Sequence, residues 1–240
     1  MDFTSLYSTR IQTTFDDDQA SILKTFHSKL SSKEGLKVTL TNYYKGLPII
    51  YPAKILGVER GTLDMDVTPQ QAVAIATDRY SLIRSALFAY PILAHVQYAN
   101  VKKHAASLNK LCFVEILAEK RAAVRLDLEP PVSAKMQSGD LEIAGDLVDI
   151  STSGLAITVD RYVTVESGTE MTVTFPLPDP VLLTETFISL AATLVGIAGN
   201  GAPYRYKFRI SPEKHHEQLI SRYSFQRQVE IIRSLKEVAA

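Results

Sequence analysis

Two arginines four residues apart, Arg121 and Arg125, are well suited to bind an anionic partner. A guanidinium group is planar, always charged, and presents a rigid fork of donors that matches phosphate oxygens and the O6/N7 edge of guanine. Apolar residues alternate with other residues from Arg121 to Leu128, which predicts a half-buried strand that ends at Pro130 and Pro131. Both arginines would then point to the same side of that strand.

A second polar segment, Asp149-Ile150-Ser151-Thr152-Ser153-Gly154, follows the arginines along the chain. Its carboxylate can accept hydrogen bonds from guanine N–H groups, and the Ser151 hydroxyl can bond a phosphate or its own turn. Gly154 permits a positive φ or a close backbone approach. Lys120 and Ser153 are neighbours of these residues and are further candidates for a ligand site.

Each segment taken alone also has a simpler explanation. Two arginines at this spacing are usually part of a solvated surface. The pattern Asp-x-Ser-x-x-Gly also fits a strand-ending turn, in which Asp and Ser bond the local backbone and Gly supplies a left-handed residue. The order of the two segments, their separation and the strand-rich sequence around them favour a joint ligand site.

The combination Arg-x-x-x-Arg and Asp-x-Ser-x-x-Gly resembles the signature of the PilZ family, whose members bind the bacterial messenger cyclic di-GMP. The resemblance covers roughly residues 118–236. It implies that the two arginines, Asp149, Ser151 and Gly154 bind cyclic di-GMP, with no cofactor and no metal ion. The layout is similar to the flagellar-brake type of this family, in which a split-barrel domain precedes the PilZ domain and the arginine motif lies in the connection.

The chain has 240 residues and is 46% hydrophobic, which is enough for two ordinary domains with cores of their own. The predicted domains are a split-barrel-like domain over residues 1–117 and a PilZ-like domain with a C-terminal helix over residues 118–240. The predicted fold is mostly β, with two small antiparallel barrels in tandem, an N-terminal helix and a C-terminal helix. The first helix follows Asp16-Asp17-Asp18, because acidic residues favour the first turn of a helix.

Short β-type runs separated by glycine and proline carry the prediction of the two barrels. In the first half they are Leu36–Thr41, Ile49–Val58, Thr62–Val67, pieces of Leu82–Val101, and Leu111–Leu117. In the second half they are Val132–Met136, Leu141–Ile150, Leu155–Asp160, Glu170–Leu177, Thr186–Ile197 and Tyr204–Ile210. Ser211 and Pro212 then predict a helix that runs to about Lys236.

Composition and motifs disfavour several other classes of protein. The formal net charge is zero, and neither half is a basic module for DNA or RNA. The five histidines have no metal-site spacing, and neither a hydrolase elbow nor a phosphate-binding glycine loop occurs, so no enzyme is predicted. Cys112 is predicted to be a buried, small hydrophobic residue. The N-terminus lacks a secretory layout, and charged residues and proline interrupt the apolar region Leu82–Ala99. A cytoplasmic protein without membrane insertion is therefore expected.

Two functions remain open on the sequence. In the first, the protein is a cyclic di-GMP receptor that changes the relation between its domains, and hence its contact with a protein partner, when the ligand binds. In the second, it is a non-binding structural or interaction module with a similar barrel. Self-association is compatible with both. The output of a receptor, whether flagellar motility, secretion, transcription or adhesion in a biofilm, is not indicated by the sequence.

Overall fold

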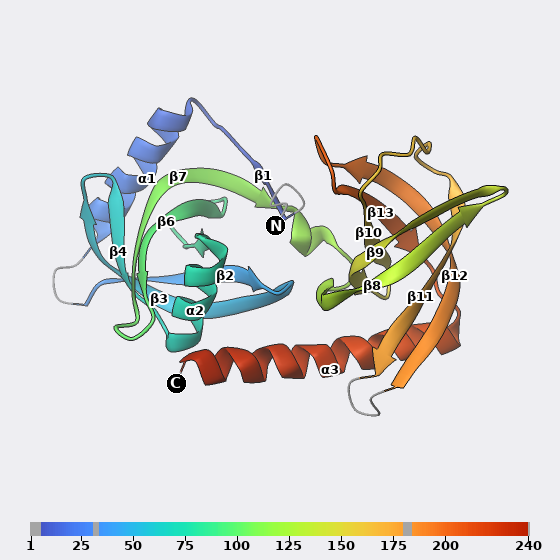
Figure 1. The fold of residues 1–240 in the computed structure, drawn as a ribbon. Helices are drawn as coiled ribbons and strands as arrows, with labels where there is room; N and C mark the ends of the chain where they lie inside the picture. The colour runs from blue at the N-terminus through green and yellow to red at the C-terminus, as the bar shows by residue number, and fades with distance from the viewer. Residues whose placement is uncertain (1–5, 31–33, 180–183, 240) are drawn as a thin grey trace. The chain divides into compact units, whose positions relative to one another are not determined.

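The computed structural model describes residues 6–30, 34–179 and 184–239. The mostly β fold with two barrels, a helix near the N-terminus and a helix at the C-terminus is confirmed (Figure 1). The chain divides into a first unit, Met1–Arg121 with Ile232–Ala240, and a second unit, Ala122–Ile231. The sequence analysis placed the boundary after residue 117 and gave the whole C-terminal helix to the second domain.

The first unit contains a closed ring of six antiparallel strands. They are β2 (Leu36–Tyr44), β3 (Leu47–Glu59), β4 (Thr62–Asp66), β5 (Tyr80–Arg84), β6 (Ile92–Asn100) and β7 (Ala105–Ile116). Neighbours pair in the order β7-β4-β3-β2-β5-β6, and β6 also pairs with β7, which closes the ring. β1 (Tyr7–Thr9) pairs with β7 from outside the ring. Alternate residues such as Leu40, Ile55 and Leu108 face inward and are fully buried, as the period of a strand requires.

The predicted N-terminal helix is confirmed as α1 (Phe15–Lys29). Thr14 caps the helix, because its hydroxyl accepts a hydrogen bond from the backbone N–H of Asp17. Ile22 and Phe26 lie one turn apart and are fully buried in the core of the first unit. The helix therefore covers the barrel with one apolar face.

A second helix of the first unit, α2 (Pro69–Asp78), was not predicted. Thr68 caps it and Pro69 occupies its first turn, which are ordinary signals of a helix start. Six of its ten residues are buried, including the polar Gln71 and Asp78. Three of its apolar residues are alanines, so only Val73 and Ile75 offer large apolar side chains from which a helical period could be recognised.

The second unit contains a closed barrel of six antiparallel strands. They are β8 (Leu126–Ser138), β9 (Leu141–Ser151), β10 (Gly154–Val159), β11 (Glu170–Asp179), β12 (Thr184–Ala198) and β13 (Tyr204–Ile210). Their order is β10-β13-β12-β11-β8-β9, and β9 pairs with β10 to complete the barrel. The inward side chains form one core, in which Tyr206, Phe175 and Phe208 are the largest fully buried residues.

The start of β8 differs from the prediction. The strand begins at Leu126, after both arginines, and it continues through Pro130 and Pro131 to Ser138. The pairing register with β9 shifts between Asp127 and Val132, so the two prolines lie in an irregular part of the strand where a missing N–H costs no regular ladder bond. The prediction that the prolines end the strand was wrong for this reason.

The long C-terminal helix, α3 (Lys214–Ala239), begins two residues after Pro212. Ile220 and Tyr223 of α3 belong to the core of the second unit, while its last turns from Ile232 onward belong to the first unit. Phe225 is 68% exposed, so part of the aromatic and apolar pattern of this helix lies outside the core. Of the helices in the described residues, none is long and apolar enough to cross a bilayer.

Candidate ligand-binding site

Asp149 lies near the end of β9, where the strand is irregular. Ala156 of β10 pairs with Asp149, but the following residue, Ile157, pairs with Leu147, so β9 carries one extra residue at this point. A bulge of this kind changes which side chains face the core. Leu147 and Ile150 both lie in the barrel core, so Asp149 faces away from it, although only 4% of the residue is exposed.

Two guanidinium groups share the Asp149 carboxylate. Arg205 of β13 forms a short ion pair with Oδ2, and Arg125 Nη1 lies 3.9 Å from Oδ1. The Arg125 and Arg205 side chains are 21% and 25% exposed, so solvent screens both pairs only in part. Asp149 Oδ1 is buried and has no hydrogen-bond partner among the described residues. This oxygen therefore keeps an unused acceptor position, although it is shielded from solvent.

Gly154, the first residue of β10, allows Arg125 to lie against the backbone. A Cβ atom at Gly154 would lie 2.5 Å from Arg125 Nη2 and 2.8 Å from the carbonyl oxygen of Phe208, which is too close for any side chain. The φ angle of Gly154 is not positive, so the interpretation that it supplies a left-handed turn residue was wrong. The close backbone approach explains this glycine.

Ser151 stabilises the turn that joins β9 to β10. Its hydroxyl donates to the carbonyl oxygen of Gly154 over 3.1 Å and accepts from the backbone N–H of Ser153 over 3.4 Å. The Ser151 and Ser153 hydroxyl oxygens are 3.5 Å apart. Ser151 is 1% exposed, and its hydroxyl bonds the backbone of its own turn. Of the two roles that the sequence suggested for this hydroxyl, a bond to phosphate or a bond to its own turn, the structure shows the local bond. Ser153 is only partly buried, at the tip of the hairpin.

Arg121 and Lys120 belong to the first unit, whereas Asp149 and its partners belong to the second. Lys120 ends a short 3₁₀ helix, η2 (Leu117–Lys120), and its ammonium group lies 2.8 Å from Glu115 Oε1. Arg121 follows as the C-cap in an extended conformation. Since neither Arg121 nor Arg125 lies in a strand, the prediction that they project from the same side of one strand was wrong.

Asp127 adds a second carboxyl to the surroundings of Asp149. The two residues are direct cross-strand partners in β8 and β9. Burial, with a further contribution from the charge of Asp149, raises the pKa of Asp127 to about 6, while Arg205 and Arg227 act in the opposite direction. The local charge therefore changes in mildly acidic solution. Within residues 6–30, 34–179 and 184–239, no three His, Cys, Asp or Glu side chains gather as metal ligands would.

Arg227 connects α3 to the strand that carries Asp127. Its guanidinium group lies 3.2 Å from Glu129 Oε2 of β8 and 3.2 Å from Glu230 Oε2 of its own helix. The Arg227 side chain is largely buried, whereas both glutamates are about half exposed. The pair with Glu129 joins α3 to the first part of β8, and the pair with Glu230 lies within the helix.

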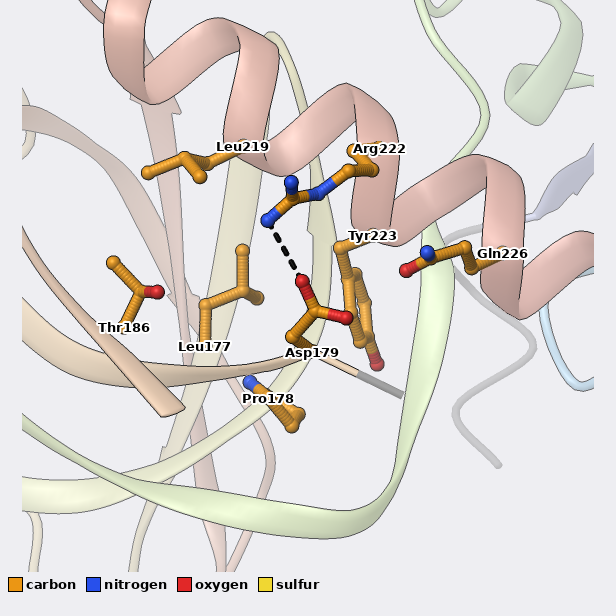
Figure 2. Close-up of a pocket in the computed structure, with 8 residues that line it drawn as sticks. All are labelled: Leu177, Pro178, Asp179, Thr186, Leu219, Arg222, Tyr223 and Gln226. Atoms are coloured by element: carbon orange, nitrogen blue, oxygen red, sulfur yellow. Dashed lines mark hydrogen bonds and ion pairs between the residues drawn. The ribbon is translucent and has the colours of Figure 1, made fainter. Parts of the chain in front are cut away.

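A small pocket marks another contact between α3 and the barrel of the second unit (Figure 2). Arg222 of α3 donates to Asp179 Oδ2 at the end of β11 over 2.7 Å, the bond drawn as a dashed line in Figure 2. Tyr223 lies next to this pair, and burial raises its pKa to about 12. The buried Asp179 carboxylate is paired with a helix residue, so this contact attaches α3 to the barrel.

Arg205, Asp127 and Arg227 were not predicted as members of the charged cluster. Arg205 alternates with the buried Tyr206 in a strand, which indicates only that its side chain points away from the core. Its meeting with Asp149 depends on how β13, β10 and β9 pair, and that register is not readable from one strand. Three basic residues, Arg205, Lys207 and Arg209, alternate with apolar ones in this strand, and nothing local singles out Arg205 among them.

A family model matches the part of the chain that contains this cluster. Residues 119–226 match the model of the PilZ domain. The second unit is thus a small closed barrel with a charged cluster at one hairpin, and the chain contains a PilZ domain. No curated protein sequence matches the chain.

Several solved structures are similar to most of the chain. YcgR from Escherichia coli, solved in complex with c-di-GMP, is 16% identical, with 92% of this chain and 93% of that chain covered and a TM-score of 0.45. The inhibitor of motility MotI/DgrA from Bacillus subtilis is 17% identical, with 83% and 99% covered and a TM-score of 0.43. MrkH of K. pneumonia, in a c-di-GMP complex, is 9% identical, with 95% and 99% covered and a TM-score of 0.44.

Proposed function

We propose that this protein is a receptor for cyclic di-GMP and that it is not an enzyme. The observation that carries the proposal is the arrangement of Arg125, Asp149 and Gly154 inside a PilZ domain. The bare backbone at Gly154 holds one guanidinium fork next to a buried carboxylate oxygen that has no hydrogen bond. A cyclic dinucleotide of guanine offers what these groups bind, namely phosphate oxygens for the fork and base N–H groups for the carboxylate.

The proposed ligand site consists of two parts. Arg125, Asp149 and Gly154 form the part on the barrel, where Ser151 and Ser153 shape the hairpin. Arg121, with Lys120 beside it, would supply the second cationic part from the chain segment before the barrel. The extended backbone after Arg121 supports this role, because extended residues can bring a second guanidinium group onto a bound phosphate or guanine.

We also propose that the ligand changes the relation between the two units and so the contact with a protein partner. Arg121 is the last residue of the first unit before the junction, and Arg125 lies just inside the second. A ligand that contacts both arginines would fix the short segment between them. Ordering a linker is one way in which a ligand selects among arrangements, to the extent that it binds one of them more tightly.

Small-angle X-ray scattering of the full chain tests this change of arrangement. We expect the scattering curve to change when saturating cyclic di-GMP is added, and the curve of Arg125→Ala to stay the same. Superimposable native curves with and without ligand, together with an unchanged oligomeric state, would exclude the switch and leave simple binding intact.

One observation favours the alternative of a non-binding module. Arg125 and Arg205 already have an acidic partner in Asp149, so the cluster could serve only to join β9, β13 and the start of β8. In that case the charged groups stabilise the barrel and no ligand is needed.

Isothermal titration calorimetry of the full chain with cyclic di-GMP separates the two functions. Linear di-GMP is the control, since it has the same bases and two phosphates without the closed ring; its terminal phosphate gives it at least as much negative charge as the cyclic ligand. We expect saturable binding of the cyclic ligand and much weaker binding of the linear one. A folded protein that binds neither would support the structural module.

A further inference from the structure

The Asp149 carboxylate has two cationic partners, and they are not equivalent. Arg205 forms a close ion pair with Oδ2, whereas Arg125 Nη1 is 3.9 Å from Oδ1 and makes no hydrogen bond to it. The tighter partner comes from β13, on the far side of β10 from Asp149. The looser partner is the arginine that the proposed function assigns to the ligand.

With two cationic partners, Asp149 would keep one counter-charge when Arg125 binds a ligand. If Arg125 turns toward a ligand phosphate, its interaction with Asp149 weakens. A carboxylate that is 4% exposed and loses its counter-charge carries a large desolvation penalty. Arg205 remains in place and prevents that loss. Arg125 is then free to bind the ligand while Asp149 keeps a cationic partner.

We infer that Arg205 is a positioning residue of the ligand site. It holds Oδ2 of Asp149, which directs Oδ1 toward the ligand as an acceptor and releases Arg125 for the phosphate or guanine edge. This inference rests on the proposed function and extends it to a residue that lies outside both sequence motifs.

The surroundings of Arg205 are rigid enough for this role. Tyr206, the next residue, is fully buried, and its hydroxyl donates to the carbonyl oxygen of Val163 over 2.7 Å and accepts from the Val163 N–H over 2.8 Å. Tyr204, on the other side of Arg205, packs edge-on against Tyr162 at 5.1 Å between ring centroids. A strand anchored on both sides of a residue holds its side chain in a reproducible position.

Three variants of the full chain test the inference by calorimetry with cyclic di-GMP. Arg205→Gln keeps polar character but removes the charge, and Arg205→Lys keeps the charge without the planar fork. Arg161→Gln is the control, because it changes an exposed arginine two residues beyond the end of β10 that is opposite to Gly154. We expect Arg205→Gln to weaken binding roughly tenfold or more, Arg205→Lys to recover part of that loss, and Arg161→Gln to bind like the native protein. Thermal melts identify any variant that has lost its fold.

A double-mutant cycle with Asp149→Asn shows whether Arg205 acts through Asp149. We expect Arg205→Gln to change affinity less than about twofold in the Asp149→Asn background, because the group that it positions is already altered. Full additivity would overturn the positioning role, since it would mean that Arg205 acts on the ligand independently of Asp149.

Base selectivity gives a readout that a purely structural residue would not move. Cyclic di-IMP lacks the exocyclic amino group of guanine, so the native protein should prefer cyclic di-GMP. We expect Arg205→Gln to lose much of that preference as Asp149 loses its orientation. If the native protein binds cyclic di-GMP and Arg205→Gln binds it with unchanged affinity and selectivity, the inference is wrong. If the native protein does not bind, the proposed function itself fails.

Discussion

Two of the buried aspartates, Asp78 in the first unit and Asp149 in the second, have opposite kinds of partners. In the first unit, Asp78 accepts bonds from the Asn42 side-chain amide over 3.0 Å and from the Tyr43 backbone N–H over 3.2 Å. Burial is the main cause that raises the pKa of Asp78 to about 6. In the second unit, Asp149 has guanidinium partners, of which Arg205 is the closer. Neutral donors satisfy the first carboxyl, whereas cations compensate the second.

The wider surroundings of the two aspartates also differ, with uncharged, buried groups around Asp78 and charged, partly exposed groups around Asp149. Asn42 in the first barrel also accepts from the Gln71 amide over 2.7 Å and from the Ser81 hydroxyl over 2.8 Å, and all of these residues are buried. The network joins α2 to the strands β2 and β5, and its bonds lie within the protein. The cluster around Asp149 has partly exposed arginines and one carboxylate oxygen without a hydrogen bond. The first network also leaves one buried acceptor, Gln71 Oε1, without a hydrogen bond, so the unused oxygen alone does not distinguish the two sites. The partly exposed cations beside Asp149 are what favour a ligand in the second unit.

The largest expected effect is on the arginines of the second cluster. We expect Arg125→Ala and Arg121→Ala each to weaken binding of cyclic di-GMP roughly ten- to a hundredfold, since each removes charge-assisted hydrogen bonds worth about 1.5 to 3 kcal/mol. Asp78→Asn is the matched change in the other barrel and should leave the affinity at its native value. Calorimetric titration of the three variants checks this. Near-native affinity in both folded arginine variants would mean that the ligand site has been assigned wrongly.

A substitution at Gly154 tests whether this glycine serves ligand binding or only the turn between β9 and β10. Gly154→Ala places a Cβ atom against Arg125 Nη2 and the Phe208 carbonyl, so we expect at least a tenfold loss of affinity and a destabilisation of about 1 to 3 kcal/mol. Gly196→Ala in β12 is the control, because a Cβ atom there would meet nothing within 4 Å. Binding curves beside chemical denaturation curves measure both effects. A Gly154→Ala protein that loses stability but keeps its affinity would show that Arg125 is not held for the ligand.

The fold was largely predictable because most strands of both barrels alternate between core and solvent. The predicted runs Leu141–Ile150 and Tyr204–Ile210, for example, agree with β9 and β13 to within a residue at each end. Where a helix is short and has few large apolar side chains, as in α2, its period is hard to recognise, and this helix was not predicted. The strand β8 was divided in two in the prediction, before and after Pro130 and Pro131, because these prolines lie in an irregular stretch that no periodic pattern reveals.

The candidate site was only partly predictable, for a different reason. Asp149, Gly154 and Arg125 come from two segments, and the structure brings these three together. Arg205 is distant from both segments in the sequence and reaches Asp149 through two strand pairings and a bulge. Residue types and spacing indicate a ligand chemistry, but the register of the sheet decides which further charges take part.

Acid titration should separate the neutral network from the other charges in the protein. The pKa of Asp78 in the folded state, about 6, lies above the ordinary value of about 3.9 in an unfolded chain. The folded protein therefore binds more protons between about pH 4 and 6, and stability falls as the pH rises through that window. We expect Asp78→Asn to lose this dependence, so that the stability difference between native protein and variant changes by on the order of 2 kcal/mol from pH 4 to 7.

The change with pH in the stability difference between native protein and Asp78→Asn is the quantity to measure. The stability difference at a single pH also contains the effect of hydrogen bonds that the amide rearranges at every pH. Denaturant unfolding at pH 4, 5, 6 and 7 gives the change with pH directly. Asp127→Asn provides a comparison from the other barrel, since Asp127 has a similarly raised pKa of about 6. A native protein and an Asp78→Asn variant whose stabilities run parallel across this range would contradict a buried, neutral-partnered carboxyl at this position.

The smallest expected effect is a pH dependence of ligand affinity. Of the two carboxyls with a raised pKa, Asp78 and Asp127, we expect only Asp127 to contribute to it. Asp127 is the cross-strand partner of Asp149 and carries a charge only above a pH of about 6. A bound dianion would raise the pKa of Asp127 further, so binding takes up protons and affinity falls as the pH rises. With solvent screening, an interaction of about 0.5 to 1 kcal/mol corresponds to a two- to fivefold loss between pH 5 and 7.5. Calorimetry at these pH values should show this slope in the native protein and in Asp78→Asn, and a flat profile in Asp127→Asn. An unchanged slope in Asp127→Asn would place the titrating group elsewhere.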